Sequence, residues 1–182
     1  MKILETKRLV LREWEDKDIP PFVAMNQDPE VMKFFPSISS HQETLNLVTR
    51  MRKQFNEHGF TGFAVELKTT EEFIGFVGLM IPNFEAHFTP CVEIGWRIAK
   101  PYWNQGYATE AARAVLRAAF EKYNLEEIVS FTAAANKPSI RVMEKIGLRR
   151  DPKDDFFHPK LPKDHPLAKH VLYRLNKDSA QG

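Results

Sequence analysis

A stretch in the middle of the chain, Tyr102–Ala111, has the residue types of an anion-binding turn. Gly106 and Ala108 stand between residues 92–99, which alternate like a strand, and residues 111–120, whose apolar side chains repeat at helical spacing. A helix that begins at such a turn offers unpaired backbone N–H groups and the positive end of its dipole. Small side chains let a phosphate approach the backbone closely. The stretch therefore predicts a site for a pyrophosphate.

Taken by itself, a Gly-x-Ala turn also fits an ordinary connection between a strand and a helix. A second segment with helix start and stop residues follows at positions 136–148. Asn136 is a good N-cap residue, Pro138 fits a first helical turn, and Gly147 is a usual helix stop. Ser139 falls in the first turn of this expected helix.

Both segments resemble signatures of the GCN5-related N-acetyltransferases (GNAT). Tyr102–Ala111 resembles the family's acyl-coenzyme A loop, Gln/Arg-x-x-Gly-x-Gly/Ala, although Trp103 stands where the pattern begins with Gln or Arg. The residue pattern of this stretch, Tyr-Trp-x-x-Gly-Tyr-Ala-Thr-Glu-Ala, resembles that of the family branch that includes the ribosomal-protein N-terminal acetyltransferases (RimJ/RimL-like). The segment 136–148 resembles the second signature, and residues 7–12 match a third. The resemblance covers residues 6–150 and, more weakly, the last expected strand.

The resemblance implies an α/β (α+β) fold made of one N-acetyltransferase domain over residues 1–182, with its core at 6–175. The expected sheet is mixed, mostly antiparallel and twisted, with about six or seven strands and about four flanking helices. Two central parallel strands are expected to splay apart as a V.

The rest of the chain supplies the elements of such a sheet. Ser39 or Ser40 is expected to cap a helix that ends near Gly59. Gly75 and Gly78 interrupt an expected strand, which indicates a bulge or the close approach of a ligand. The expected strands besides 92–99 lie at 6–13, 62–67, 73–81, 126–133 and 170–175, and the capped helix lies at 41–57.

The composition argues against several other classes of protein. The chain has 182 residues, 43% hydrophobic and 27% charged, and its net charge of +2 argues against a nucleic-acid binder driven by bulk charge. Cys91 is the single cysteine, and no apolar run has membrane-spanning length, so a cytoplasmic protein without a membrane partner is expected. The six histidines have no paired metal spacing, and no metal site is expected.

By resemblance, the protein is an enzyme that transfers an acetyl group from acetyl-CoA directly to a primary amine, without an acyl-enzyme. The acceptor would be a small molecule or a protein N-terminus, and a homodimer is a family-level expectation. The pantetheine arm would add to the strand edge near Trp96 and Ile98, and Asn136 would contact it from the opposite side. Backbone amides of the turn would bind the pyrophosphate, namely those of Asn104, Gln105, Gly106, Tyr107, Ala108 and Thr109.

Two side chains are candidates for proton transfer. Glu93 lies on the expected catalytic strand and is the candidate base, the alternative being a salt-bridged strand residue. Ser139 is the candidate acid for the leaving thiolate, the alternative being a hydroxyl that bonds the backbone of its helix turn. The proline- and charge-rich segment 151–169 fits either a lid over the acceptor or a solvated connector.

Two other classes of protein remain as alternatives. A non-catalytic acyl-CoA-binding or sensor domain on the same fold fits the substitution at Trp103 and the uncertain base. A dinucleotide-binding domain would need Gly-x-Gly-x-x-Gly after a first strand, and the chain has no such pattern.

Overall fold

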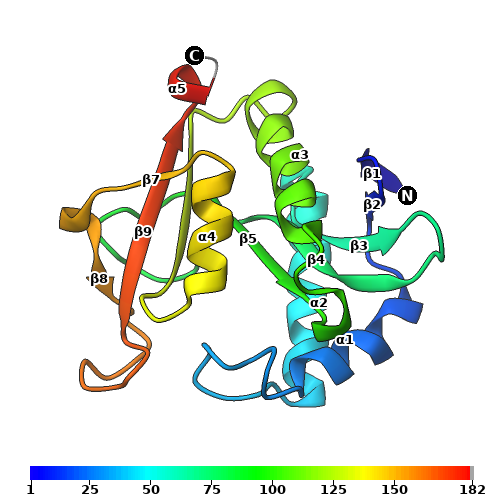
Figure 1. Cartoon of the computed structure of the whole chain (residues 1–182), viewed down its shortest axis with the longest axis horizontal. Helices are drawn as coiled ribbons and strands as arrows, with labels where there is room; N and C mark the ends of the chain where they lie inside the picture. Colours follow the sequence, from blue (N-terminus) through cyan, green and yellow to red (C-terminus); the bar gives the residue numbers. More distant parts are fainter. Residues whose placement is uncertain (181–182) are drawn as a thin grey trace.

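The computed structural model describes residues 1–180, in which one open sheet carries helices on both faces (Figure 1). The strands are β1 (Lys2–Glu5), β2 (Leu9–Arg12), β3 (Gly62–Leu67), β4 (Phe73–Met80), β5 (Glu93–Ile98), β6 (Glu127–Ala133), β7 (Arg149–Arg150), β8 (Phe156–Phe157) and β9 (Lys169–Asn176). The helices are α1 (Ile19–Asn26), α2 (His41–His58), α3 (Tyr107–Glu121), α4 (Lys137–Lys145) and α5 (Lys177–Ala180), with 3-10 turns at Asp16–Asp18, Lys100–Tyr102 and Pro152–Asp154.

The nine strands lie in the order β1-β2-β3-β4-β5-β6-β9-β7, with β8 paired to β9. Every pairing is antiparallel except that of β5 with β6. The predicted α/β class and the mixed, mostly antiparallel sheet are therefore confirmed. The sheet has more strands than expected because β1, β7 and β8 are short pieces without a periodic pattern of their own. Residues 181 and 182 of the predicted domain lie outside the described part.

The two parallel strands touch at one end only, and they form the predicted V. The register of β5 with β6 contains the single pair Glu93–Val129. Two further contacts close this end: Val129 N–H donates to the Val92 carbonyl oxygen at 3.1 Å, and the Ser130 hydroxyl donates to the Ile94 carbonyl oxygen at 2.8 Å. Beyond Ile94 the strands separate.

The helices that flank the V begin at its open end. β5 leads through a short turn into α3, and β6 leads into α4. Because the two strands are parallel and each helix runs back along its strand, both helices start at the carboxyl ends of the strands. Figure 1 shows α3 and α4 beside the diverging strands, each beginning at the same end of the sheet.

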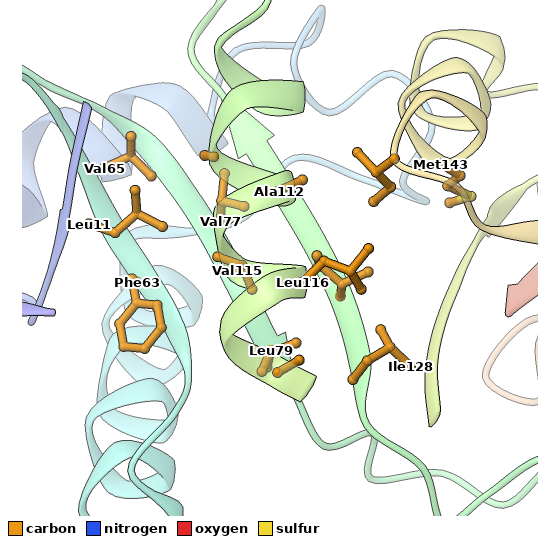
Figure 2. Close-up of a cluster of buried hydrophobic side chains, with 14 of the residues drawn as sticks. Leu11, Phe63, Val65, Val77, Leu79, Ala112, Val115, Leu116, Ile128 and Met143 are labelled. Atoms are coloured by element: carbon orange, nitrogen blue, oxygen red, sulfur yellow. The ribbon is translucent and has the colours of Figure 1, made fainter. Parts of the chain in front are cut away.

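The main core lies between the sheet and α3. In Figure 2, Val115 of α3 lies beside Val77 and Leu79 of β4, and Leu116 of the same helix points toward Ile128 of β6. Small alanines let the helix approach the sheet closely, and the larger side chains fill the space between. This packing fixes the position of the turn at which α3 begins.

The opposite face of β2–β5 is covered by α1 and α2, whose Phe22, Val48 and Met51 are buried against the sheet. Helix α2 begins at Ser40, which forms a capping box with Glu43, and ends at Gly59. Both ends agree with the sequence prediction, which left Ser39 and Ser40 open. The segment 27–39 between the two helices borders the same face.

Gly75 lies at an irregularity of the sheet where two backbones approach closely. The register of β3 with β4 shifts between Val65 and Glu66, opposite this glycine, whose φ is 145°. A Cβ at Gly75 would lie 2.1 Å from the Arg97 carbonyl oxygen. Of the two expected causes, a bulge and the close approach of a ligand, the bulge is seen, and the atom that approaches Gly75 closely belongs to the backbone of β5.

The segment 151–169 is fastened at its start. Phe156 is buried and packs with Phe88, Val129 and Leu172, on one face of β6 and β9. A purely solvated connector does not describe this part of the segment. Among residues 1–180, no helix is long and apolar enough to cross a membrane.

Candidate active site

The turn before α3 has the geometry of an anion site. Gly106 is the N-cap residue, and its φ of 79° lies in the left-handed region that glycine adopts without strain. Within residues 1–180 no side chain caps this helix end. The N–H groups of Tyr107, Ala108 and Thr109 therefore point outward from a positive helix end, where a phosphate can accept from them.

A cationic side chain, Arg8, also lies at this turn, and the sequence analysis assigned it no role there. The Arg8 guanidinium lies 4.4 Å from the centre of the Tyr107 ring, and a Cβ on Gly106 would be 3.5 Å from Arg8 Nη2. Glu110 holds Arg8 in place, because its carboxylate accepts from Arg8 Nε at 2.7 Å and from the Thr6 hydroxyl at 2.6 Å. The paired charges leave part of the guanidinium available beside the helix end.

Side chains in the turn fix its shape. Trp103, which replaces the Gln or Arg of the family pattern, donates from its indole N–H to the Ile98 carbonyl oxygen at 2.7 Å. Gln105 Nε2 donates to the Pro101 carbonyl oxygen at 3.1 Å, and Asn104 has a left-handed φ of 59°. The contacts predicted for Asn104 and Gln105 are those of their backbone amides, and the Gln105 side chain is engaged within the turn.

The edge of β5 at the V carries free peptide groups. The carbonyl oxygens of Val92, Ile94 and Ile98 all point toward β6 or Trp103, as their hydrogen bonds show. Because alternate residues of a strand point to the same edge, the peptide groups of Trp96 face the gap as well. The predicted edge at Trp96 and Ile98 is open, although the Ile98 carbonyl is already engaged by Trp103.

The start of α4 lies on the other side of the gap. Asn136 is the N-cap residue: its Oδ1 accepts from Ser139 N–H at 3.4 Å, and its Nδ2 donates to Thr132 Oγ1 at 2.9 Å. The side-chain amide that was predicted to contact pantetheine is therefore engaged within the protein. No hydrogen bond of the Ser139 hydroxyl is found within residues 1–180, so the structure does not support the backbone-bonded alternative.

Glu93 lies where β5 and β6 part. Strand alternation places its side chain on the face opposite Ile94 and Ile98, which belong to the α3 core. Removal from water raises the pKa of Glu93 to about 8, and no charged partner among the described residues opposes this shift. The salt-bridged alternative is not seen, and a carboxyl group whose pKa is raised by its site is a candidate base.

The same face of β5 also carries Arg97, four residues after Glu93. Its Nη1 donates to Asn26 Oδ1 at 2.9 Å, a contact between residues far apart in the chain. Within residues 1–180, no cluster of three or more His, Cys, Asp or Glu side chains is arranged to hold a metal ion.

The parts therefore form one site around the open V. The uncapped start of α3 and Arg8 offer positive charge on one side, and the start of α4 with Ser139 lies on the other. The strand edge between them offers peptide groups to an extended amide-containing chain. Glu93 stands at the closed end, on the face away from α3.

Comparison with known proteins agrees with this arrangement. The family model described as "Acetyltransferase (GNAT) domain" matches residues 8–149. The relative named "Uncharacterized N-acetyltransferase YnaD" from Bacillus subtilis is 36% identical over 172 residues, covering 94% of this chain and 95% of its own. The "FsC-acetyl coenzyme A-N(2)-transacetylase" of Aspergillus fumigatus is 32% identical over 138 residues, covering 68% of this chain and 55% of its own.

A solved structure shows the same fold. The GNAT-family acetyltransferase from Bacillus anthracis superposes with a TM-score of 0.77 at 30% identity, covering 98% of this chain and 99% of the other. The family match spans both motif segments and the V between them. The chain belongs to the GNAT family of acetyltransferases, and the prediction of an acetyltransferase enzyme is confirmed.

Proposed function

We propose that the protein transfers the acetyl group of acetyl-CoA directly to a primary amine, of a small molecule or a protein N-terminus. One observation carries this proposal: a carboxyl group with a raised pKa, Glu93, stands at the closed end of a V whose open end is flanked by an uncapped helix start. A site of this form joins a phosphate-binding end to a proton acceptor along one strand.

The cofactor would be held by groups of three elements. The amides of Tyr107, Ala108 and Thr109 would bind the pyrophosphate, with Arg8 as an additional cation. The pantetheine arm would pair with the peptide groups of Trp96. Asn136 would act through the helix start that it caps rather than through its side-chain amide.

The chemistry then follows from charge. An alkyl ammonium has a pKa of about 10, so the acceptor must lose a proton before it attacks. Glu93 would take that proton, the amine nitrogen would bond to the thioester carbon, and the carbon–sulfur bond would break. Ser139 would donate a proton to the leaving thiolate and recover one from solvent. The products are the N-acetylated amine and free CoA.

A direct transfer fits the state of the single thiol. Burial is the first cause that raises the pKa of Cys91 to about 11, and the nearby Glu93 adds to it. A thiol with so high a pKa is a poor nucleophile at neutral pH, because the thiolate is the reactive form. We therefore assign no acyl-enzyme to Cys91.

Finer assignments extend the proposal. The aromatic pair Tyr102-Trp103 before Gly106 supports a place in the branch of the ribosomal-protein N-terminal acetyltransferases. A cytoplasmic location and a homodimer stay predictions.

Thermal unfolding with and without acetyl-CoA tests the cofactor assignment first. A ligand that binds only the folded state at a hundredfold excess over its Kd stabilises it by about 2.7 kcal/mol. Free thiol is then measured with acetyl-CoA and a panel of primary amines, and the product is identified by mass spectrometry. An unchanged midpoint, or thiol release that is independent of amine, would refute the proposal.

A further inference from the structure

Arg97 is held on the face of β5 that carries Glu93. Its guanidinium carbon lies 4.5 Å from the centre of the Phe35 ring and 5.4 Å from that of Phe76, so the cation is placed between two aromatic rings. Phe35 belongs to the segment 27–39 and is 41% exposed. The guanidinium therefore contacts a ring that is partly open to solvent, at the end of α1 and beside the segment 27–39.

No carboxylate in the part of the chain that the structure describes forms an ion pair with Arg97. Within residues 1–180, no Asp or Glu oxygen lies within 4.0 Å of Arg97, and its buried Nε has no acceptor. Removal from water lowers the pKa of Arg97 to about 10. Arg12, also on the α1 side of the sheet, differs: its guanidinium contacts Asp18 at 2.7 Å and Glu66 at 2.9 Å. Buried cations are normally paired in this way, because desolvating an unpaired charge is costly.

A neutral group instead fixes the orientation of Arg97. Asn26 is fully buried and accepts from Arg97 Nη1 at 2.9 Å. The Asn26 side-chain amide donates in turn to Thr44 Oγ1 at 3.1 Å, and the backbone carbonyl oxygen of Asn26 accepts from Ser39 N–H at 3.0 Å. Asn26 thus ties the end of α1 to α2 and holds the guanidinium without removing its charge.

We propose that Arg97 binds a carboxylate of the acceptor whose amine is deprotonated at Glu93. This inference rests on the proposed function and narrows the acceptor to an amine that carries a carboxylate. Arg97 and Glu93 share one face of β5 and are four residues apart, which separates their Cα atoms by about 13 Å. An acceptor whose amine and carboxylate are several bonds apart suits this spacing better than one that carries both on the same carbon.

A homologous series of probes tests the inference. The series consists of glycine, β-alanine, 4-aminobutyrate and 6-aminohexanoate, each paired with the carboxamide of the same length. We expect kcat/KM for CoA release to favour the carboxylate by roughly 10- to 100-fold at the best length, because a hydrogen-bonded ion pair is worth more than a neutral contact.

Three variants locate the preference. Arg97→Gln is expected to abolish it, and Arg149→Gln, which changes an exposed arginine on β7, is expected to retain it. Asn26→Asp keeps Arg97 but supplies an internal counter-ion at the position of the 2.9 Å contact, so it is expected to lower the preference as well. Asn26→Asp therefore tests the role of Arg97 even if the Arg97→Gln variant does not fold.

The outcomes are separable from failure of the proposed function. Equal rates for carboxylates and carboxamides in the wild-type protein, or a preference that survives in both Arg97→Gln and Asn26→Asp, overturn the role of Arg97. If no amine at all releases CoA, the proposed function fails. Thermal shifts by the carboxylate probes in the presence of CoA then still test Arg97: a shift that is lost in Arg97→Gln supports the anion site, and the absence of any shift in the wild type refutes it.

Discussion

At the scale of single residues, the site depends on how the protein treats a few polar groups. Glu93 and Ser139 are the two proposed proton-transfer groups, and neither is engaged by a hydrogen bond that the structure describes. By contrast, Asn136 has both ends of its amide occupied. Unengaged polar groups at a strand end and at a helix start can act on a ligand without first breaking a bond.

Ser139→Ala is expected to lower kcat by about tenfold or more, within the range for loss of an acid–base group, and to leave the Kd for acetyl-CoA unchanged. Steady-state kinetics and titration calorimetry measure the two quantities. Ser40→Ala is the matched control: this hydroxyl does bond the backbone of a helix start, so its loss should cost about 1 kcal/mol of stability and no rate. If kcat of Ser139→Ala equals that of the wild type, Ser139 is only a residue of the helix turn.

Glu93→Gln also has a predicted effect on stability. Burial raises the folded-state pKa of Glu93 to about 8, from an ordinary value of 4.5. Between these values the folded state binds more protons than the unfolded state, so the contribution of Glu93 to the free energy of unfolding falls as pH rises. Glu93→Gln has no carboxyl group at this position, so its free energy of unfolding does not fall with pH for this reason.

Chemical denaturation of both proteins between pH 5 and pH 9 checks this effect. The free energy of unfolding of Glu93→Gln should gain on that of the wild type across the window, by roughly 1–3 kcal/mol, since one unit of pKa shift corresponds to about 1.4 kcal/mol and residual solvation absorbs part of it. A difference that is independent of pH would mean that the Glu93 carboxyl group is well solvated.

At the scale of elements, the start of α3 is the part that the site requires most. Gly106→Asp is expected to weaken acetyl-CoA binding by roughly 10- to 100-fold, because it brings bulk and negative charge to the helix end that we propose as the phosphate site. Titration calorimetry measures the change. Gly59→Asp provides the control: Gly59 has φ of 76° at the end of α2, close to the 79° of Gly106, and nothing lies within 4 Å of its added Cβ. Equal losses of affinity in the two variants would assign the effect to backbone strain.

Elements with local signals were predictable from the sequence. Ser40 and Gly59 mark the ends of α2 by capping chemistry that acts over a few residues, and β5 shows the alternation of a half-buried strand. Strands β7 and β8 are only two residues long and exist because β9 pairs with them. Pairing with β9 gives these two segments their extended conformation, and two residues are too few for a periodic pattern that would predict a strand.

Site residues divide in the same way. The turn at Gly106 is a contiguous motif, so a single stretch of sequence contains its chemistry. The contacts of Arg8 with Glu110 and of Arg97 with Asn26 join positions 102 and 71 residues apart. Such pairs depend on the order of strands in the sheet, which the spacing of residue types does not encode. Sequence reasoning therefore predicted the turn that we propose as the phosphate site, and it assigned no role to Arg8 or Arg97.

At the scale of the whole molecule, two halves of one sheet meet at the V. The half with β6 and β9 has α4 on one face, and its other face is covered by aromatic side chains of the segments 82–90 and 151–169. Phe84, Phe88 and Phe131 form edge-on ring contacts there, and Phe156 joins them. Through Phe156, this cluster attaches the segment 151–169 to the half of the sheet that contains β6 and β9.

Phe156→Ala is expected to destabilise the fold by about 3 kcal/mol, because it leaves a cavity in a packed aromatic cluster. Phe157→Ala, at the next position and 51% exposed, should cost less than about 1 kcal/mol. Equilibrium denaturation compares the two variants. Equal small losses would mean that the segment 151–169 is a loose connector, as the alternative interpretation of the sequence holds.

The pH dependence of amine-dependent CoA release, measured for the wild type and Glu93→Gln, tests the central claim most directly. We predict that kcat/KM of the wild type rises with pH through about 8, where Glu93 loses its proton, and rises further toward the acceptor's own pKa of about 10. Glu93→Gln should lack the first rise and be slower by roughly 100-fold or more at pH 8. Profiles of the same shape and height for both proteins would contradict the assignment of Glu93 as the base of a direct acetyl transfer.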